Sequence, residues 1–196
     1  MLKQYFSLSI FTSLLMGFIS LHLLAQKTTI PGEERLSVFE GYPIPKEKDM
    51  IFYIQKSFNT NTVVYAANFG DDGKLDPKEP VKVYWLRYQE QGQKRELKYV
   101  ERKFGYGINS KPLKDKPNTY LFTLVSLKKM NFVISQDKNG KVKVATTINN
   151  KPAYIDRVFV TAEHVNILPK IFTVEVFGRE LKTHNFVYEK FIHNEK

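Results

Sequence analysis

The sequence of 196 residues contains no cysteine. This absence excludes disulfide bonds, thiol nucleophiles, zinc sites built on thiolates and a lipid anchor attached to cysteine. Many small exported domains depend on disulfides for their stability, so this chain has to hold its fold by packing alone. Aromatic residues make up 14% of the sequence, and each of them offers a large apolar area for such a core.

Catalytic motifs are also missing. Beyond residue 25 the chain has no G-x-S-x-G nucleophile elbow, no H-E-x-x-H helix and no glycine-rich phosphate loop. Histidine is scarce as well, with four in the whole sequence. Only Glu163, His164 and Glu101 stand out as possible acid–base groups. An enzyme acting on envelope glycan or lipid therefore remains an alternative to a binding protein.

Acidic residues are in the minority, with 20 Asp and Glu against 30 Lys and Arg, which gives a formal net charge of +10. A basic surface attracts anionic partners over long range. For an exported protein the expected partners are anionic envelope components, glycolipid or polysaccharide, and no nucleic acid. A positive charge that only keeps the protein soluble is the alternative explanation.

Long apolar runs are absent except at the N-terminus. Lys3 precedes an uncharged apolar run from Tyr5 to Leu24, and the small residue Ala25 follows. This order is typical of a secretory signal peptide. Residues 1–25 are therefore predicted to be cleaved, which leaves a protein in the periplasm, on the cell surface or secreted, without a membrane span. An uncleaved anchor is the alternative, because about 20 apolar residues can cross a bilayer.

After the signal peptide the texture of the chain changes twice. Residues 26–49 contain prolines and scattered charges, which is typical of an extended leader or tether. From Met50 onward, short runs rich in Val, Ile, Phe, Tyr and Thr predict one β-rich domain over residues 50–196. Nine strands are expected, at residues 50–57, 62–69, 81–88, 119–127, 130–137, 141–148, 153–163, 171–178 and 184–192.

Alternation and turn residues indicate how these strands are arranged. Alternation in 171–178 places Val174 and Val176 on one face and Glu175 on the other. Asn139-Gly140 is the strongest hairpin signal, because both residues accept the positive φ of a type I′ turn. The predicted fold class is mainly β, an antiparallel meander that closes into a barrel or sandwich of about nine strands.

One segment follows a helical period instead. In residues 93–104, three apolar side chains recur at helical spacing and predict one amphipathic helix that lies on, or plugs the end of, the β structure. The opposite face carries the candidate anion-binding residues Arg95, Lys98, Tyr99 and Arg102. Arginine forks match phosphate and carboxylate oxygens, and tyrosine can stack on a sugar. A solvated helix face without a ligand is the alternative.

A polar segment at residues 68–79 resembles a calcium loop. Gly73 falls at the position of the sharp turn, and oxygen-bearing side chains fall at four ligand positions. The candidate ligands are Asn68, Asp72, Asp76 and Glu79. A polar turn between two strands is the alternative. No other cofactor is predicted.

Three segments together resemble a known family. They are Gly73-Lys74-Leu75-Asp76, the run from Pro80 to Tyr88, and the run from Tyr99 to Gly107. They are similar to exported proteins of Bacteroidota grouped as domain of unknown function 4833, over about residues 50–190. The resemblance implies export and a single domain, and it brings no activity and no catalytic residues.

These observations favour a non-enzymatic envelope protein, a binding or structural module that uses the basic helix face. A small-molecule or lipid carrier with an interior barrel cavity is an alternative, because closed antiparallel barrels enclose such cavities.

Overall fold

The computed structural model describes residues 41–165 and 168–192. The predicted signal peptide and residues 26–40 of the predicted leader lie outside the described residues. The strands are β1 (Met50–Lys56), β2 (Asn59–Ala67), β3 (Val81–Arg87), β4 (Gln93–Glu96), β5 (Ile108–Pro112), β6 (Thr119–Leu124), β7 (Leu127–Gln136), β8 (Val142–Ile148), β9 (Lys151–Val165), β10 (Leu168–Glu180) and β11 (Phe186–Ile192). The helical elements are a 3₁₀ turn, η2 (Tyr88–Glu90), and α1 (Tyr99–Glu101), which continues into a π-helical turn, η3 (Arg102–Tyr106).

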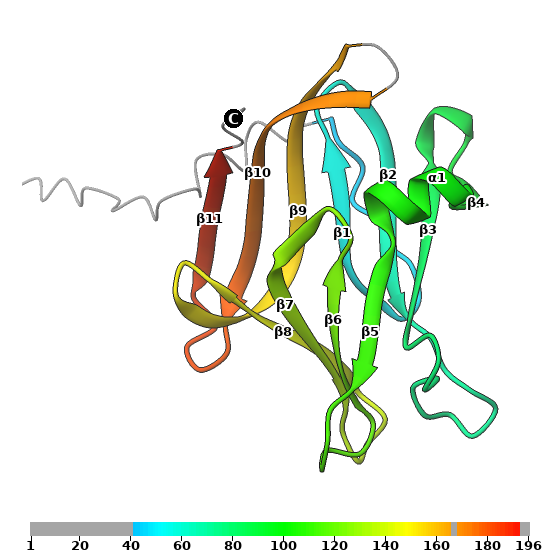
Figure 1. Cartoon of the computed structure of the whole chain (residues 1–196), viewed down its shortest axis with the longest axis vertical. Helices are drawn as coiled ribbons and strands as arrows, with labels where there is room; N and C mark the ends of the chain where they lie inside the picture. The colour runs from blue at the N-terminus through cyan, green and yellow to red at the C-terminus, as the bar shows by residue number, and fades with distance from the viewer. Residues whose placement is uncertain (1–40, 166–167, 193–196) are drawn as a thin grey trace, which may run out of the picture.

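The eleven strands form one sheet that divides along β9 (Figure 1). One edge of β9 pairs with β8 over residues 151–154 and with β1 over residues 157–160. Each of these partners begins an arm of the sheet, β1-β2-β3-β4 on one side and β8-β7-β6-β5 on the other. The other edge of β9 pairs with β10, which pairs with β11. The mainly β, mainly antiparallel fold is as predicted, with β1–β9 as the one parallel ladder among the described strands.

The two arms curl toward each other and enclose the core. Phe52 of β1 stacks on Tyr65 of β2 with ring centroids 4.4 Å apart, and on Phe132 of β7 at 5.7 Å. Phe132 in turn stacks on Phe122 of β6 at 5.1 Å. All four rings are buried, so one continuous aromatic stack joins the arms. The sheet is thus a curled half-barrel whose interior is filled by side chains.

A second apolar layer covers the opposite face of β9 and β10. Phe159 and Phe177 are buried there, and the ring of Tyr42 packs edge-on against Phe159 at 5.4 Å. The side-chain amide of Gln55 donates to the carbonyl of Pro43 at 2.7 Å. Residues 41–49, the described part of the predicted leader, therefore pack against the sheet.

The turns differ in detail from the prediction. Gly140 has a positive φ of 79°, but Asn139 does not, and the Gly140 N–H donates to the carbonyl of Asp137. This loop is a three-residue hairpin with a left-handed glycine, not the predicted two-residue type I′ turn. The next connection has positive φ at both Asn149 and Asn150, which is the type I′ pattern.

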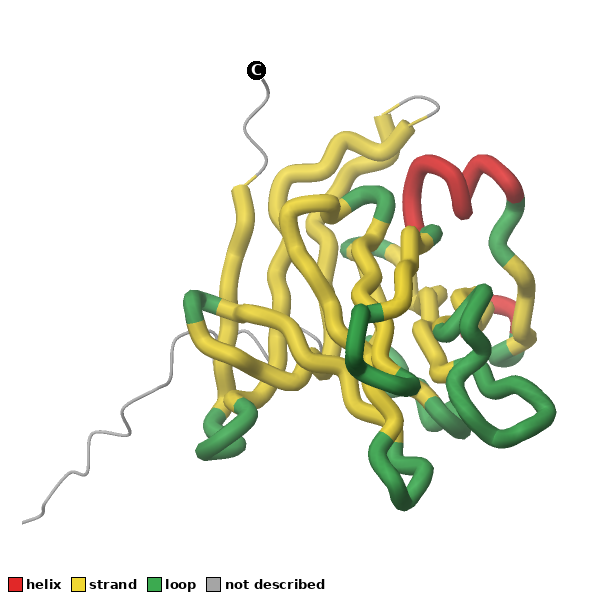
Figure 2. Tube along the Cα trace, turned by 60° about the horizontal axis from the view of Figure 1, so that its bottom comes forward, coloured by secondary structure: helices red, strands yellow, loops and turns green. Residues whose placement is uncertain are grey.

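The predicted helix at 93–104 is wrong in its extent. Residues 93–96 form β4, which pairs with β3, and the helical turns run from Tyr99 to Tyr106 beside the sheet (Figure 2). Leu97 is buried in the core, whereas Val100 and Phe104 are 58% and 64% exposed. The open edge of β3 offers a hydrogen-bonded partner, and this tertiary contact outweighs helical spacing in a short segment.

Candidate functional site

The structure brings the predicted basic residues close together, but together with acidic ones. The guanidinium of Arg95 contacts the Glu101 carboxylate at 2.8 Å. Arg102 contacts Glu79 at 3.1 Å and Glu96 at 3.5 Å. The three glutamates offset the two arginines, so this helix face does not present a free cluster of positive charge to an anionic ligand.

Glu101 is fixed by the start of the helix. Its carboxylate accepts the backbone N–H of Lys98 at 2.7 Å, which caps the helix. Burial alone would raise the pKa of Glu101, but the Lys98 N–H and the Arg95 guanidinium together hold that pKa below its usual value. A carboxyl that stays ionised near neutral pH is unsuited to the proton-donating role considered for Glu101.

Lys98 and Tyr99 point to solvent. The Tyr99 side chain is 72% exposed, and the ammonium of Lys103 lies 5.4 Å from its ring centre. Lys98 is exposed at the N-terminal cap of the helix. These two residues keep the accessibility that the prediction requires, without the two free arginines beside them.

The segment 68–79 forms a polar turn whose side chains serve the backbone. The Asn68 amide donates to the Glu79 carbonyl at 2.7 Å. One oxygen of Asp76 accepts the N–H groups of Lys78 and Glu79, and Asp72 accepts the N–H of Lys74. In residues 41–165 and 168–192, no three His, Asp or Glu side chains come together in a way that could hold a metal ion. The structure therefore does not assemble the four predicted calcium ligands.

The other acid–base candidates are not gathered into a site. Glu163 is exposed on β9, opposite Lys170 of β10. The side chain of His164 lies outside the described part of the structure. Within the described residues, no helix is long and apolar enough to span a bilayer.

An apolar groove opens where β11 and the β6–β7 turn fail to meet. We term it the lateral groove; its volume is about 770 Å³, within the range of ligand pockets of ~300–1,000 Å³. Its apolar lining comes from both sides of the opening: Val125, Leu127, Met130, Ile171, Val174, Phe191 and Ile192. Leu127, Val174 and Phe191 also pack against the core. The groove is therefore the place where the core of the curled sheet reaches solvent.

The polar rim of the lateral groove is mostly basic. Lys128 and Lys129 follow the β6–β7 turn and are exposed. The single acidic lining residue, Glu189, accepts the backbone N–H of Asn149 at 2.7 Å. Sequence reasoning missed this groove because its residues come from β7, β8, β10 and β11, and none of those segments departs from ordinary strand alternation.

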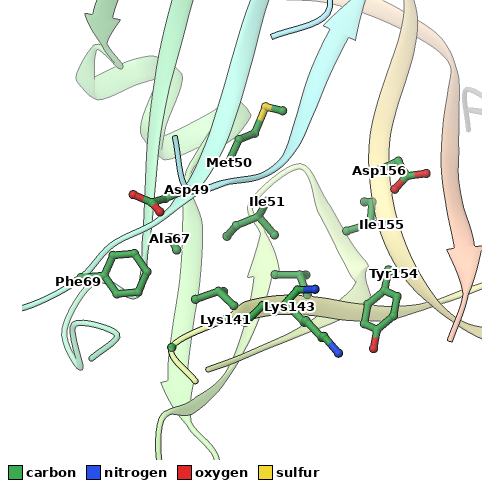
Figure 3. Close-up of a pocket in the computed structure, with 13 residues that line it drawn as sticks. Asp49, Met50, Ile51, Ala67, Phe69, Lys141, Lys143, Tyr154, Ile155 and Asp156 are labelled. Atoms are coloured by element: carbon green, nitrogen blue, oxygen red, sulfur yellow. The ribbon is translucent and has the colours of Figure 1, made fainter. Parts of the chain in front are cut away.

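A second cleft lies at the fork where β1 and β8 leave β9, and we term it the fork cleft (Figure 3). Its volume is about 440 Å³. Figure 3 shows Lys141 and Lys143 on the β8 side, with Met50 and Ile51 of β1 opposite them. Tyr154, Ile155 and Asp156 of β9 lie where the two strands diverge.

Comparison with known proteins gives a family and no close relative. A family model described as Domain of unknown function (DUF4833) matches residues 52–190, from β1 into β11. No curated protein and no solved structure matches the chain.

Proposed function

The chain belongs to the DUF4833 family, and we propose that it is an exported, non-enzymatic binding protein that holds an anionic amphiphile in the lateral groove. The observation that carries this proposal is the opening of the apolar core between β7 and β10–β11, with two lysines on its rim. The ligand class is an alkyl or acyl chain that ends in a phosphate or a carboxylate.

The apolar lining supports an alkyl chain as one part of the ligand. Met130 is buried, Leu127, Ile171, Val174 and Phe191 are partly exposed, and Ile192 is 69% exposed. Covering such a surface is favourable by roughly 25 cal/mol per Å² of apolar area removed from water. A chain of methylene groups fits a lining that offers few directional polar contacts along its length.

The rim supports an anionic head group as the other part. Lys128 and Lys129 are adjacent, so they point in alternating directions from the strand and flank the opening from two sides. Glu189 is already occupied by the Asn149 N–H, which leaves the two ammonium groups as the dominant free charges of the rim. The basic contact thus moves from the helix face, where glutamates pair the arginines, to the end of the β6–β7 turn.

Titration calorimetry with dodecyl phosphate, below its micelle concentration, tests the ligand class. Dodecyl phosphate should bind, raise Tm through linkage and be recovered chemically unchanged, whereas dodecyltrimethylammonium should bind more weakly. Lys128→Glu/Lys129→Glu should weaken dodecyl phosphate binding by about three- to tenfold, because each exposed charge contact contributes ~0.2–1 kcal/mol. Lys141→Glu/Lys143→Glu, which makes the same change of charge at the fork cleft, is the matched control. Equal affinity for both detergents, or no effect at the rim, would contradict the proposal.

The export part of the proposal is supported by Lys3, the apolar run that follows it and Ala25. N-terminal sequencing of the protein purified from a fractionated source organism tests it. The expected first residue is Gln26 or a residue within one or two positions of it, in a fraction outside the cytoplasm. A cytoplasmic product that begins at Met1 would refute export and leave the groove proposal standing.

A further inference from the structure

The fork cleft contains two strand segments that have a partner on one edge only. β8 pairs with β9 over residues 145–148, so Val142 to Val144 extend beyond that ladder. β1 pairs with β9 from Tyr53 onward, so Met50 to Phe52 extend beyond theirs. Both segments line the cleft with their main chain, and both are held on their other edge by β7 or β2.

The direction of the main-chain groups follows from the hairpin at the other end of β8. Ile148 and Lys151 face each other across the two-residue turn, so Ile148 directs its N–H and C=O toward β9. Because this direction alternates along a strand, Val144 and Val142 direct their main-chain groups to the same side. Val142 does so beyond the last residue of β8 that β9 reaches.

The side chains beside this edge divide by face. Val144 is buried and Val142 half-buried, on the core side with Ile51. Lys141 and Lys143 are exposed on the other face, with the Lys143 ammonium 5.6 Å from the Tyr154 ring centre. An added strand would thus meet an apolar inner row and a cationic outer row.

Two acidic residues also line the cleft and set the net charge there. Asp156 is paired with Arg179 at 3.6 Å, and Asp49 is exposed at the entrance, before β1. The two lysines therefore exceed the free acidic charge by one. The excess lies on the outer face of β8, in line with the positions that a paired strand would occupy.

We propose that the fork cleft binds an extended peptide that adds to β8 as an antiparallel strand, with acidic side chains across from Lys141 and Lys143 and apolar side chains toward the core. Strand addition at an open sheet edge is a recurring mode of peptide recognition, in which main-chain hydrogen bonds give affinity and alternate side chains give specificity. Opposite charges across paired strands add ~0.2–1 kcal/mol each. This partner is a peptide, distinct in chemistry and in place from the amphiphile of the lateral groove.

Fluorescence anisotropy of a labelled heptapeptide that alternates valine and glutamate tests this proposal on the chain without residues 1–25. The acidic peptide should bind saturably, and a peptide that alternates valine and lysine should not. Lys141→Glu/Lys143→Glu should weaken binding by roughly five- to thirtyfold, with Tm unchanged because both side chains are exposed. Lys128→Glu/Lys129→Glu is the matched control and should bind the peptide like the unaltered protein.

Two further measurements separate strand addition from simple charge attraction. The acidic peptide with alternate amides N-methylated keeps its charge but loses main-chain donors, and its binding should disappear. Amide exchange at Val142 and Val144 should slow when the unmodified peptide binds. No binding, equal affinity for acidic and basic peptides, full binding by the methylated peptide, or competition by free N-acetylglutamate at the same concentration would each overturn the proposal.

Discussion

Tyr106 is the residue that fastens the helical turns to the core. Its ring meets Trp85 edge-on at 5.1 Å, and its carbonyl accepts the hydroxyl of Tyr65 at 2.7 Å. Burial, with a smaller contribution from the Glu101 carboxylate, raises the pKa of Tyr106 to about 12. The phenol must therefore stay neutral for the fold to keep its full stability.

This pKa sets the direction of a stability change at alkaline pH. An unfolded tyrosine titrates near ~10, so above that pH the unfolded state loses its proton first and stability falls as the pH rises toward 12. The contribution is complete below pH ~10 and amounts to roughly 2–3 kcal/mol. Tyr106→Phe should remove this part of the loss in urea unfolding measured at pH 8, 10 and 12. Tyr99→Phe, on an exposed ring, is the control; the same loss in both variants would contradict the assignment.

Glu175 shows where alternation misleads at the level of a single residue. Strand alternation correctly separates it from Val174 and Val176, which face the core cluster. Its own face is nevertheless covered, and Glu175 is fully buried, with the Tyr188 hydroxyl donating to it at 2.7 Å. A carboxylate in a strand looks solvent-facing from the sequence because the second apolar layer that covers it comes from other segments.

Among the elements, the central pair β9 and β10 is held close by a glycine. A Cβ atom added at Gly178 would clash with the Tyr154 carbonyl and would lie 2.7 Å from Cδ1 of Ile148. The ladder register shifts at this point, between Phe177 and Gly178. The small residue lets β10 curve over the place where β8 meets β9.

Gly178→Ala should therefore destabilise the protein by about 1–3 kcal/mol, or more if the backbone cannot shift. Gly105→Ala is the matched control, because its Cβ would meet nothing within 4 Å and its φ is not positive. That change should be neutral or stabilise the helical turn by up to ~1 kcal/mol. Urea midpoints of the two variants measure the difference, and equal midpoints would show that the strand contact relaxes freely.

The long strands could be predicted because their alternation is strong, and the short ones could not. β4 reads Gln-Lys-Arg-Glu and β5 reads Ile-Asn-Ser-Lys-Pro, and neither carries an apolar row. Arg102 and Glu79 lie 23 residues apart in the chain, so their ion pair depends on the tertiary fold. The two clefts were equally hidden, since each is formed by the ends of several strands.

At the scale of the whole molecule, one core accounts for both clefts. The aromatic stack fills the centre of the curled sheet, so apolar surface reaches solvent only toward its margins. The lateral groove lies where β11 leaves the curl open, and the fork cleft lies where the arms separate from β9. The two proposed ligands thus occupy separate margins, and the crossed lysine variants can test each without disturbing the other.

The parallel ladder between β1 and β9 constrains the order in which the chain can fold. Tyr53 pairs with Arg157, so the N-terminal strand finds its central neighbour only after most of the polypeptide has been made. Such distant pairing slows folding, because a large loop must close before the contact is gained. A chain that enters a translocation channel N-terminus first would remain threadable during synthesis, since its sheet cannot close until the last third arrives.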